Sequence, residues 1–177
     1  ANKEIVVSLE KMNDMNWVSE KDQVICQAGA ITDSVKSFVA EHNRLLPISL
    51  ASSSSSSIGG NVATNAAGSK FIKYGSTKDH ISKIKVMLAN GEMLTLKKEI
   101  KKDATGPNLM ELFFGSEGAL GIIYEVTFNT CEQPTYIENI LIRTSELNSI
   151  REHILVPEVK NIISSIEYWD ENCQKLL

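Results

Sequence analysis

The sequence has few of the residues that build several common kinds of site. It has three cysteines, widely spaced and without a C-x-x-C pair, which argues against a disulfide scaffold and a zinc site. Its three histidines are scattered and form no H-E-x-x-H motif, so we expect no bound metal. The motifs G-x-S-x-G, G-x-x-x-x-G-K-[ST] and G-x-G-x-x-G are all absent. Serine-hydrolase, P-loop and Rossmann-type chemistry are therefore not indicated.

Charge and hydropathy argue against two further classes of protein. Lysine and arginine total 18 against 22 for aspartate and glutamate, and this net charge of -4 is not typical of a nucleic-acid-binding protein. No apolar run approaches the roughly 18 to 20 residues of a membrane span, and the first residues show no signal-peptide pattern. Hydrophobic residues make up 42%, enough for a packed core. The cysteine usage fits a reducing compartment, so we expect a cytoplasmic protein, or an organellar-matrix protein in a eukaryote.

Hydrophobic periodicity predicts an α+β domain. Asn90-Gly91 favours a hairpin turn, and the hydroxyl of Thr32 is expected to cap the helix that follows it. Asn108 and Glu111 resemble a capping box, with an apolar helix stripe of Leu109, Leu112 and Phe113. The predicted strands are 4–9, 24–28, 84–88, 94–96, 121–128, 136–142 and 162–169. The predicted helices are 32–46, 107–113 and 145–155. Pro47 ends the first of these helices and Pro157 ends the last. A change in composition at 131–134 predicts a domain boundary, beyond which the tail is too short for a core of its own.

The most unusual stretch is residues 51–75, ASSSSSSIGGNVATNAAGSKFIKYG, in which six serines precede two glycines and a run of small residues. Such a stretch has too little bulk to fill a core. It can instead bring backbone N–H groups and hydroxyls close to a phosphate or a planar ring system. The alternative is a flexible serine-rich linker. Spaced apolar residues such as Ile58 and Val62 argue against a linker, because a linker needs none of them.

A second glycine-rich stretch is GSEGALGIIY, residues 115–124. Its glycines at 115, 118 and 121 lie between a predicted helix and a predicted strand. Both their spacing and this context differ from the Rossmann fingerprint, which follows a strand. Taken alone, the stretch fits a tight helix-to-strand turn as well as it fits a ligand contact.

The two stretches together resemble a known family. SIGGNVATNAAGSKFIKYGSTKDHI followed by LFFGSEGALGIIYEVTF is similar to the FAD-linked oxidases with a vanillyl-alcohol-oxidase-type (PCMH-type) FAD-binding domain. The nearest patterns are those of the glycolate oxidase D subunit, D-lactate dehydrogenases and D-2-hydroxyglutarate dehydrogenases. Weaker similarities at VVSLEKMNDM, QAGA and IEYWD extend the resemblance over nearly the whole chain. A cell-wall precursor reductase shares the cofactor domain, but GSEGALGII favours the oxidase branch.

This resemblance implies the second subdomain of a flavin domain, a mixed or antiparallel sheet flanked by helices. Residues 1–131 would form part of the FAD-binding domain, and 132–177 would begin a C-terminal substrate domain. The implied activity is oxidation of a small 2-hydroxy acid of the glycolate or D-lactate type by hydride transfer to FAD, with a second subunit or an electron acceptor as partner. The implied cofactor-binding residues are Gly29, Ala51, Ser52, Ser53, Ser54, Ser55, Ser56, Ser57, Ile58, Gly59, Gly60, Asn61, Thr64, Asn65, Ala66, Ala67, Gly68, Tyr74, Gly75, Glu117, Gly118, Ala119, Leu120, Gly121, Ile122 and Ile123.

The chain departs from the family pattern in three respects. It has no P-x-G-G-G-T loop, its serine run replaces more varied residues, and the family's long C-terminal domain with a histidine-containing metal site is not matched. We therefore expect the central third of such an enzyme and assign no catalytic residue. Two functions stay open. The chain is either the FAD-binding part of an oxidoreductase, or a truncated module that folds or associates with a partner without binding FAD by itself.

Overall fold

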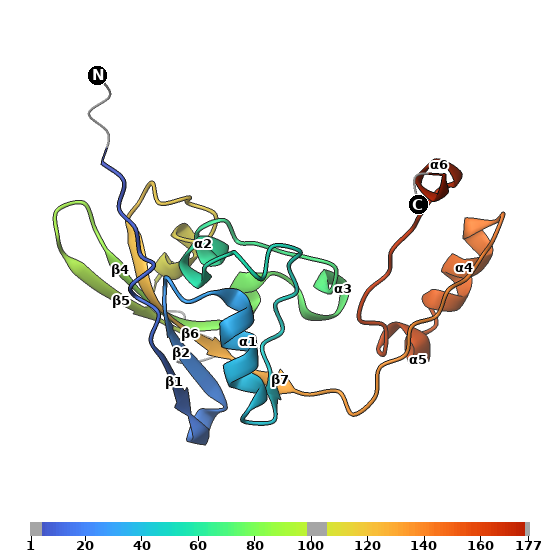
Figure 1. Cartoon of the computed structure of the whole chain (residues 1–177), viewed down its shortest axis with the longest axis horizontal. Coiled ribbons are helices and arrows are strands. Elements are labelled where there is room, and N and C mark those ends of the chain that lie inside the picture. The colour runs from blue at the N-terminus through green and yellow to red at the C-terminus, as the bar shows by residue number, and fades with distance from the viewer. Residues whose placement is uncertain (1–4, 99–105, 176–177) are drawn as a thin grey trace.

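The computed structural model describes residues 5–98 and 106–175. Its centre is a five-stranded antiparallel sheet in the order β1-β2-β6-β4-β5, which confirms the predicted α+β class (Figure 1). The strands are β1 (Met15–Val18), β2 (Gln23–Gln27), β4 (Ile81–Met87), β5 (Met93–Lys97) and β6 (Ile122–Asn129). A two-stranded ribbon joins β3 (Arg44–Leu45) to β7 (Cys131–Glu132). Three 3-10 turns are Ser19–Lys21, Thr77–His80 and Leu109–Leu112.

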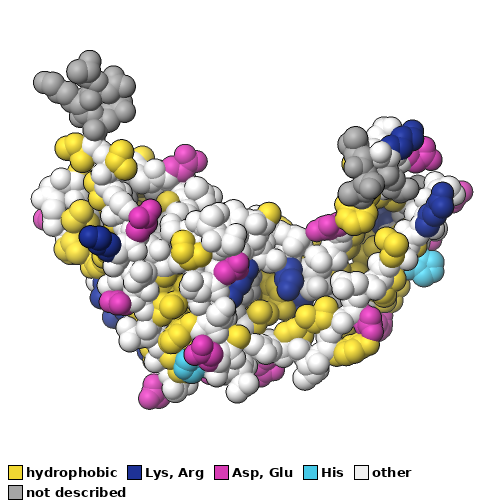
Figure 2. Space-filling model, in the orientation of Figure 1, with side chains coloured by type: hydrophobic (Ala, Val, Ile, Leu, Met, Phe, Trp, Pro, Cys, Tyr) yellow, Lys and Arg dark blue, Asp and Glu magenta, His cyan; other side chains and the backbone are white. Residues whose placement is uncertain are grey.

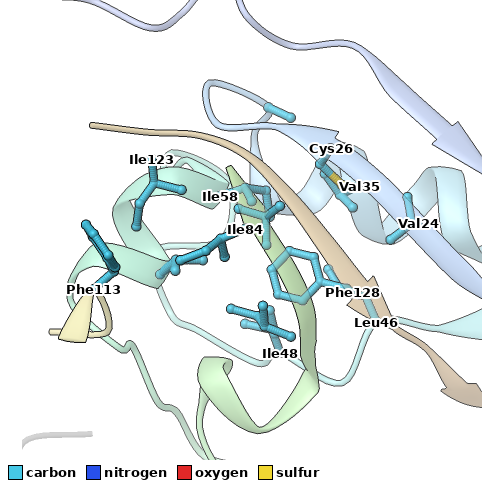
Figure 3. Close-up of a cluster of buried hydrophobic side chains, with 14 of the residues drawn as sticks. Val24, Cys26, Val35, Leu46, Ile48, Ile58, Ile84, Phe113, Ile123 and Phe128 are labelled. Atoms are coloured by element: carbon cyan, nitrogen blue, oxygen red, sulfur yellow. The ribbon is translucent and has the colours of Figure 1, made fainter. Parts of the chain in front are cut away.

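Two helices, α1 (Thr32–Ala40) and α2 (Ile58–Ala63), cover one face of this sheet. Alternate residues of the strands point to that face and are buried, because side chains of a strand alternate between its two faces. These buried strand residues pack against the apolar side chains of both helices and form the core (Figure 3). The opposite face is polar, with Glu125 Oε1 3.0 Å from Lys85 Nζ and 3.7 Å from Lys83 Nζ. The packing therefore fixes α2 directly on β2 and β6.

The predicted hairpin is confirmed in β4 and β5. The Leu88 N–H donates to the Glu92 carbonyl and the Gly91 N–H donates to the Leu88 carbonyl, both at 2.9 Å. Of the two predicted turn residues only Gly91 has a positive φ, at 84°. Left-handed backbone was expected at both Asn90 and Gly91, but the turn requires it only at Gly91.

Three predicted strands, at 4–9, 136–142 and 162–169, are wrong. Residues 5–9 and the other two segments are extended or irregular chain with no strand partner, while residue 4 lies outside the described residues. Val6 is 93% exposed and Leu141 is 89% exposed. High β-propensity reflects packing against neighbouring strands, so an apolar run with no neighbour does not become a strand.

The predicted helices also need correction. Helix α1 ends at Ala40, because Asn43 takes a left-handed φ of 57° and the chain turns into β3. Thr32 is the first residue of this helix and not its cap, since the capping position is Ile31 and no side chain bonds there. The stretch predicted as helix 107–113 contains only the 3-10 turn Leu109–Leu112.

The capping box expected at that 3-10 turn does not form. Asn108 Oδ1 accepts from the Met110 N–H at 3.2 Å, but Glu111 is 3.5 Å from the Asn108 amide side chain rather than on its backbone. Leu109 and Leu112 are exposed, so only Phe113 of the predicted stripe is buried, together with Met110. A 3-10 turn has three residues per turn, so its buried positions differ from those of an α-helix.

The chain beyond β7 stands apart from the sheet (Figure 1). It carries α4 (Leu147–Ile154), α5 (Pro157–Lys160) and α6 (Glu171–Gln174). Helix α4 confirms the predicted helix, and Pro157 begins α5, where a missing N–H costs nothing. The Gln133 side chain donates to the Arg44 carbonyl at 3.1 Å, close to where the tail leaves the sheet domain. No helix among the described residues is long and apolar enough to cross a membrane.

Removal of residues 134–177 is expected to leave the sheet domain folded with a Tm within about 2 °C of the intact chain. The reason is that the side chains of this tail are mostly exposed, including Tyr136 at 74% and Ile140 at 82%. Thermal unfolding followed by circular dichroism measures the effect. As a control, truncation after Asn129 also removes Thr130, whose hydroxyl donates to the Asp22 carbonyl at 2.7 Å, and should lower the Tm clearly. A large Tm loss on removing 134–177 alone would place the tail in the same folding unit.

Candidate functional site

The serine run is an ordered turn held against α1. Ser53 Oγ donates to the Leu50 carbonyl at 2.6 Å and accepts from Lys36 Nζ at 2.7 Å. Within the turn, the Ser56 N–H donates to the Ser52 carbonyl at 2.7 Å. These bonds fix the run at both ends, so the structure favours an ordered loop over the linker alternative.

Helix α2 continues this turn and begins on the end of β2. The N–H groups of Ile58 and Gly59 donate to the carbonyls of Ala30 and Ala28 at 2.9 and 2.8 Å. Ser57 caps the helix by accepting from the Gly60 N–H at 3.4 Å. The small residues of this motif therefore lie at the edge of the core, where their backbone is fixed by the neighbouring strand.

The second glycine-rich stretch meets the first one at the end of α2. The Glu117 N–H donates to the Ala63 carbonyl at 2.9 Å. Glu117 and Gly118 both have positive φ, at 50° and 84°, which turns the chain sharply toward β6. On β6, the Tyr124 carbonyl accepts from the Ala28 N–H at 2.9 Å. Segments that are far apart in sequence thus converge around α2.

Several glycines of these stretches are explained by close packing of the protein on itself. A Cβ at Gly59 would lie 2.6 Å from Ala28 Cβ, and one at Gly121 would lie 2.8 Å from the Met87 carbonyl. At Gly29 and Gly68 it would overlap the carbonyl oxygens of Leu9 and Ser49. At these four positions, a glycine is therefore required by the packing of the protein on itself.

Gly60 differs from these glycines. It is exposed, and an added Cβ would meet only Ser57 Oγ, at 3.2 Å. Apart from the close Ser57 hydroxyl, neither backbone nor core approaches this position, so it is open to contact with a ligand. Gly60 is therefore the glycine of the motif that best fits a contact with a cofactor.

The predicted contact residues, including these glycines, fall into three groups by exposure. Buried ones are Gly29, Ser53, Ile58, Gly59, Asn61 and Ile123. Half-buried ones are Ser56, Ser57, Asn65, Ala66, Gly68, Tyr74, Gly75, Gly121 and Ile122. Exposed ones are Ala51, Ser52, Ser54, Ser55, Gly60, Thr64, Ala67, Glu117, Gly118, Ala119 and Leu120. The exposed set offers hydroxyls and small residues along one continuous part of the chain and along the facing stretch 117–120.

A hollow with an empty volume of about 210 Å³ adjoins the first stretch. Its lining is formed by 47–50, 66–68, Lys70, Phe71 and 75–77. Of this lining, 66–68 and Gly75 were among the predicted contact residues, whereas Lys70 and 47–50 were not. Figure 2 shows lysine or arginine side chains along the concave side of the molecule, between the body and the tail. The volume of the hollow includes open solvent, and the enclosed space is only about 10 Å³, roughly that of one water molecule.

The wall of this hollow is held by a second set of hydrogen bonds. Thr77 donates to the Ala66 carbonyl through its N–H at 3.0 Å and its hydroxyl at 2.7 Å. Asp79 Oδ2 accepts from the Ser76 N–H at 2.7 Å and from Ser76 Oγ at 2.9 Å. Partial burial raises the pKa of Asp79, but these bonds and the positive charges of His80 and Lys78 lower it overall. The carboxylate therefore stays ionised and keeps the wall in place at neutral pH.

This donor set fits a phosphate-bearing cofactor with a planar ring system. The exposed hydroxyls of Ser52 and Ser54, together with Lys70, can donate to phosphate oxygens, and Gly60 leaves room for a ring. The hydroxyls of Ser55 and Thr64 already donate to the carbonyls of Ser52 and Gly60. Within the part of the chain that the structure describes, no three histidine, cysteine or acidic side chains come together as metal ligands. Nor do the described contacts contain a nucleophile paired with a base. The residues gathered here therefore supply binding groups.

Cys26 lies beside this region but is part of the core. It is fully buried on β2, and burial, followed by the charge of Glu125, raises the pKa of its thiol from 9.0 to about 12. Burial disfavours the charged thiolate, and Cys26 is buried only in the folded state, so the pKa is raised there and not in the unfolded chain. The stability that this contributes is complete below pH 9, and it is lost as the pH rises toward 12.

We expect the free energy of unfolding to fall between pH 9 and about 12, with a steeper slope in the wild-type protein than in Cys26→Ala. Urea unfolding at a series of pH values measures both slopes. Thiol labelling provides an independent control, since the exposed Cys173 should react in the folded protein and Cys26 only on unfolding. Equal slopes in the two proteins would contradict the assignment.

Comparison with known proteins identifies the family. A family profile described as "FAD binding domain" matches residues 1–97. The chain is 36% identical over 172 residues to a D-2-hydroxyglutarate dehydrogenase of Stutzerimonas stutzeri, covering 97% of this chain and 37% of that protein. It is 30% identical over 177 residues to the mitochondrial D-2-hydroxyglutarate dehydrogenase of Rattus norvegicus, covering 98% and 33%. The chain thus spans about a third of the length of these curated relatives.

The fold is also that of a solved structure. An alkyldihydroxyacetonephosphate synthase matches with a TM-score of 0.62 and 26% identity, over 72% of this chain and 23% of that one. This agrees with the resemblance to FAD-linked enzymes of the PCMH type. The family profile covers more than half of the 177 residues, and the chain belongs to the FAD-binding domain family, whose cofactor is FAD.

Proposed function

We propose that this chain is the cofactor-binding part of an FAD-dependent oxidoreductase that oxidises a small 2-hydroxy acid. The observation that carries the proposal is the convergence of the two small-residue stretches around α2, through the bond between Glu117 N and the Ala63 carbonyl, in a member of the FAD-binding family. The names of the relatives favour D-2-hydroxyglutarate as the first substrate to test, ahead of D-lactate and glycolate.

The residues of this chain would bind and orient the cofactor. When bound, FAD would supply the redox chemistry, as the acceptor of a hydride from the carbon that carries the substrate hydroxyl. Lys70 would neutralise part of the phosphate charge and the hydroxyls of Ser52 and Ser54 would donate to phosphate oxygens, while Gly60 would leave space beside a ring. We assign no catalytic base to this chain. A second subunit or an electron acceptor is the proposed partner.

The substrate proposal is tested by dye-linked oxidation with the protein at full length. D-2-hydroxyglutarate, D-lactate, glycolate and L-2-hydroxyglutarate are supplied separately, with an artificial electron acceptor. We expect turnover with at least one of the first three and none with the L-enantiomer. A flavin-loaded protein that reduces the dye with none of these acids would contradict the proposed reaction.

A second candidate is a module that folds without binding FAD by itself. It is favoured by the small enclosed volume of the hollow, about 10 Å³, and by the amides of Ile58 and Gly59, which are already bonded within the protein. We therefore expect the isolated 177-residue chain to bind FAD weakly or not at all. A flavin absorption band near one equivalent per purified chain would overturn this expectation and favour a self-sufficient FAD site.

A further inference from the structure

The hydroxyl of Thr32 joins three elements in the interior. Thr32 is 0% exposed, and its Oγ1 accepts from Asn61 Nδ2 at 2.6 Å and donates to the Ser56 carbonyl at 2.9 Å. Ser56 Oγ lies 2.9 Å from the same oxygen and can donate to it. A hydroxyl has one donor and two acceptor positions, so all three are used here. One buried atom thus links α1, the serine run and α2.

The helix that carries Thr32 does not need this hydroxyl. The cap position of α1 is Ile31, and the Thr32 side chain bonds to no N–H of its own helix. The backbone N–H of Thr32 already donates to the Ser56 carbonyl at 3.0 Å, so the strand-like contact there does not depend on the side chain either. The side-chain hydroxyl therefore adds a second bond to the Ser56 carbonyl and is the acceptor for the buried Asn61 amide.

Ser56 and Asn61 bracket the part of the site that is free to contact a ligand. Between them lie Ser57, which caps α2, and the exposed Gly60. Asn61 itself is 3% exposed, so its side chain faces the interior, although its motif position suggested a cofactor contact. Its amide is committed to Thr32 in a buried hydrogen bond of 2.6 Å.

We infer that Thr32 is a positioning residue for the cofactor-binding segment 56–61, which it fixes through Ser56 and Asn61. The inference rests on the proposed function, because it assigns this segment to FAD. An orphaned buried donor is costly, so without the hydroxyl the segment would relax away from its present shape. The side chain would then affect FAD affinity although it touches no part of the cofactor surface.

The test compares Thr32→Val, which keeps the shape and removes the hydroxyl, with Thr32→Ser, which keeps the hydroxyl. Amide hydrogen exchange of 56–61 and the FAD dissociation constant are measured with the protein at full length. In T32V we expect faster exchange confined to this segment and roughly tenfold weaker FAD binding. T32S should restore both readouts. Leu94→Ala, a change on the edge strand β5, which is separated from β6 by β4, should lower stability without altering either.

The possible results separate the inference from the proposed function. Unchanged exchange of 56–61 in T32V overturns the inference, and so does faster exchange with unchanged FAD affinity. If wild-type protein binds no FAD, the proposed function fails and takes the inference with it, whatever the exchange shows. Should T32V not fold, Ser56→Ala removes only one partner of the hydroxyl and must still raise exchange in 56–61, or the inference is wrong.

Discussion

Replacing Gly60 by valine is expected to abolish FAD binding while leaving the protein folded. Gly60 is exposed on α2. The nearest atom to the Cβ of an added side chain is Ser57 Oγ, at 3.2 Å. The core therefore does not resist the change, and glycine is in any case a poor residue inside a helix. The valine would instead occupy the space that the proposed site leaves for the cofactor. Flavin content of the protein purified at full length, with circular dichroism as a check on folding, measures both expectations.

The preceding glycine provides a matched control in the same helix. Gly59→Val places its Cβ 2.6 Å from Ala28 Cβ in a buried position, and such overpacking costs typically about 1–3 kcal/mol. We expect G59V to lose stability, and to lose flavin only as a consequence. A substitution of Lys101, which lies outside the described residues, should change neither property. Unchanged flavin content in folded G60V would remove this glycine from the cofactor site.

The difference between these two glycines could not be predicted from the sequence. Both belong to one run of small residues, and the family resemblance implied a cofactor contact at each. What separates them is Ala28, which reaches Gly59 because β2 lies under α2. That contact depends on the path of the chain between β2 and α2, which local composition does not determine. Lys70 was missed for the same reason, since a single lysine carries no signal until the fold places it in a wall.

The strands show which sequence patterns were sufficient to predict secondary structure. The hairpin of β4 and β5 and the strands β2 and β6 were predicted, because each alternates and has a partner in the sheet. The run YIENILI at 136–142 has a comparable β-propensity but no partner among the described residues, and it is not a strand. Pairing is a non-local property, so a single segment cannot reveal it. The convergence of the two glycine-rich stretches was likewise expected only from the family resemblance.

Phe128→Ala is expected to destabilise the protein by about 3–5 kcal/mol, which is a large part of the roughly 5–15 kcal/mol that holds a typical domain together. Phe128 is 0% exposed on β6 and lies among Leu46, Ile48 and Ile84 (Figure 3). The alanine would leave a cavity between β6, β4 and the loop that leads into the serine run. Urea unfolding at neutral pH measures the free energy of unfolding.

This cavity should also lower FAD affinity, because Leu46 and Ile48 anchor the segment that leads into the serine run that we assign to FAD. We therefore expect FAD affinity in F128A to fall together with stability, and a stabilising osmolyte to restore part of both. Tyr136→Ala removes a large side chain that is 74% exposed and should change stability by less than about 0.5 kcal/mol. If F128A and Y136A were equally stable, the sheet face under α1 and α2 would not be the core that positions the site.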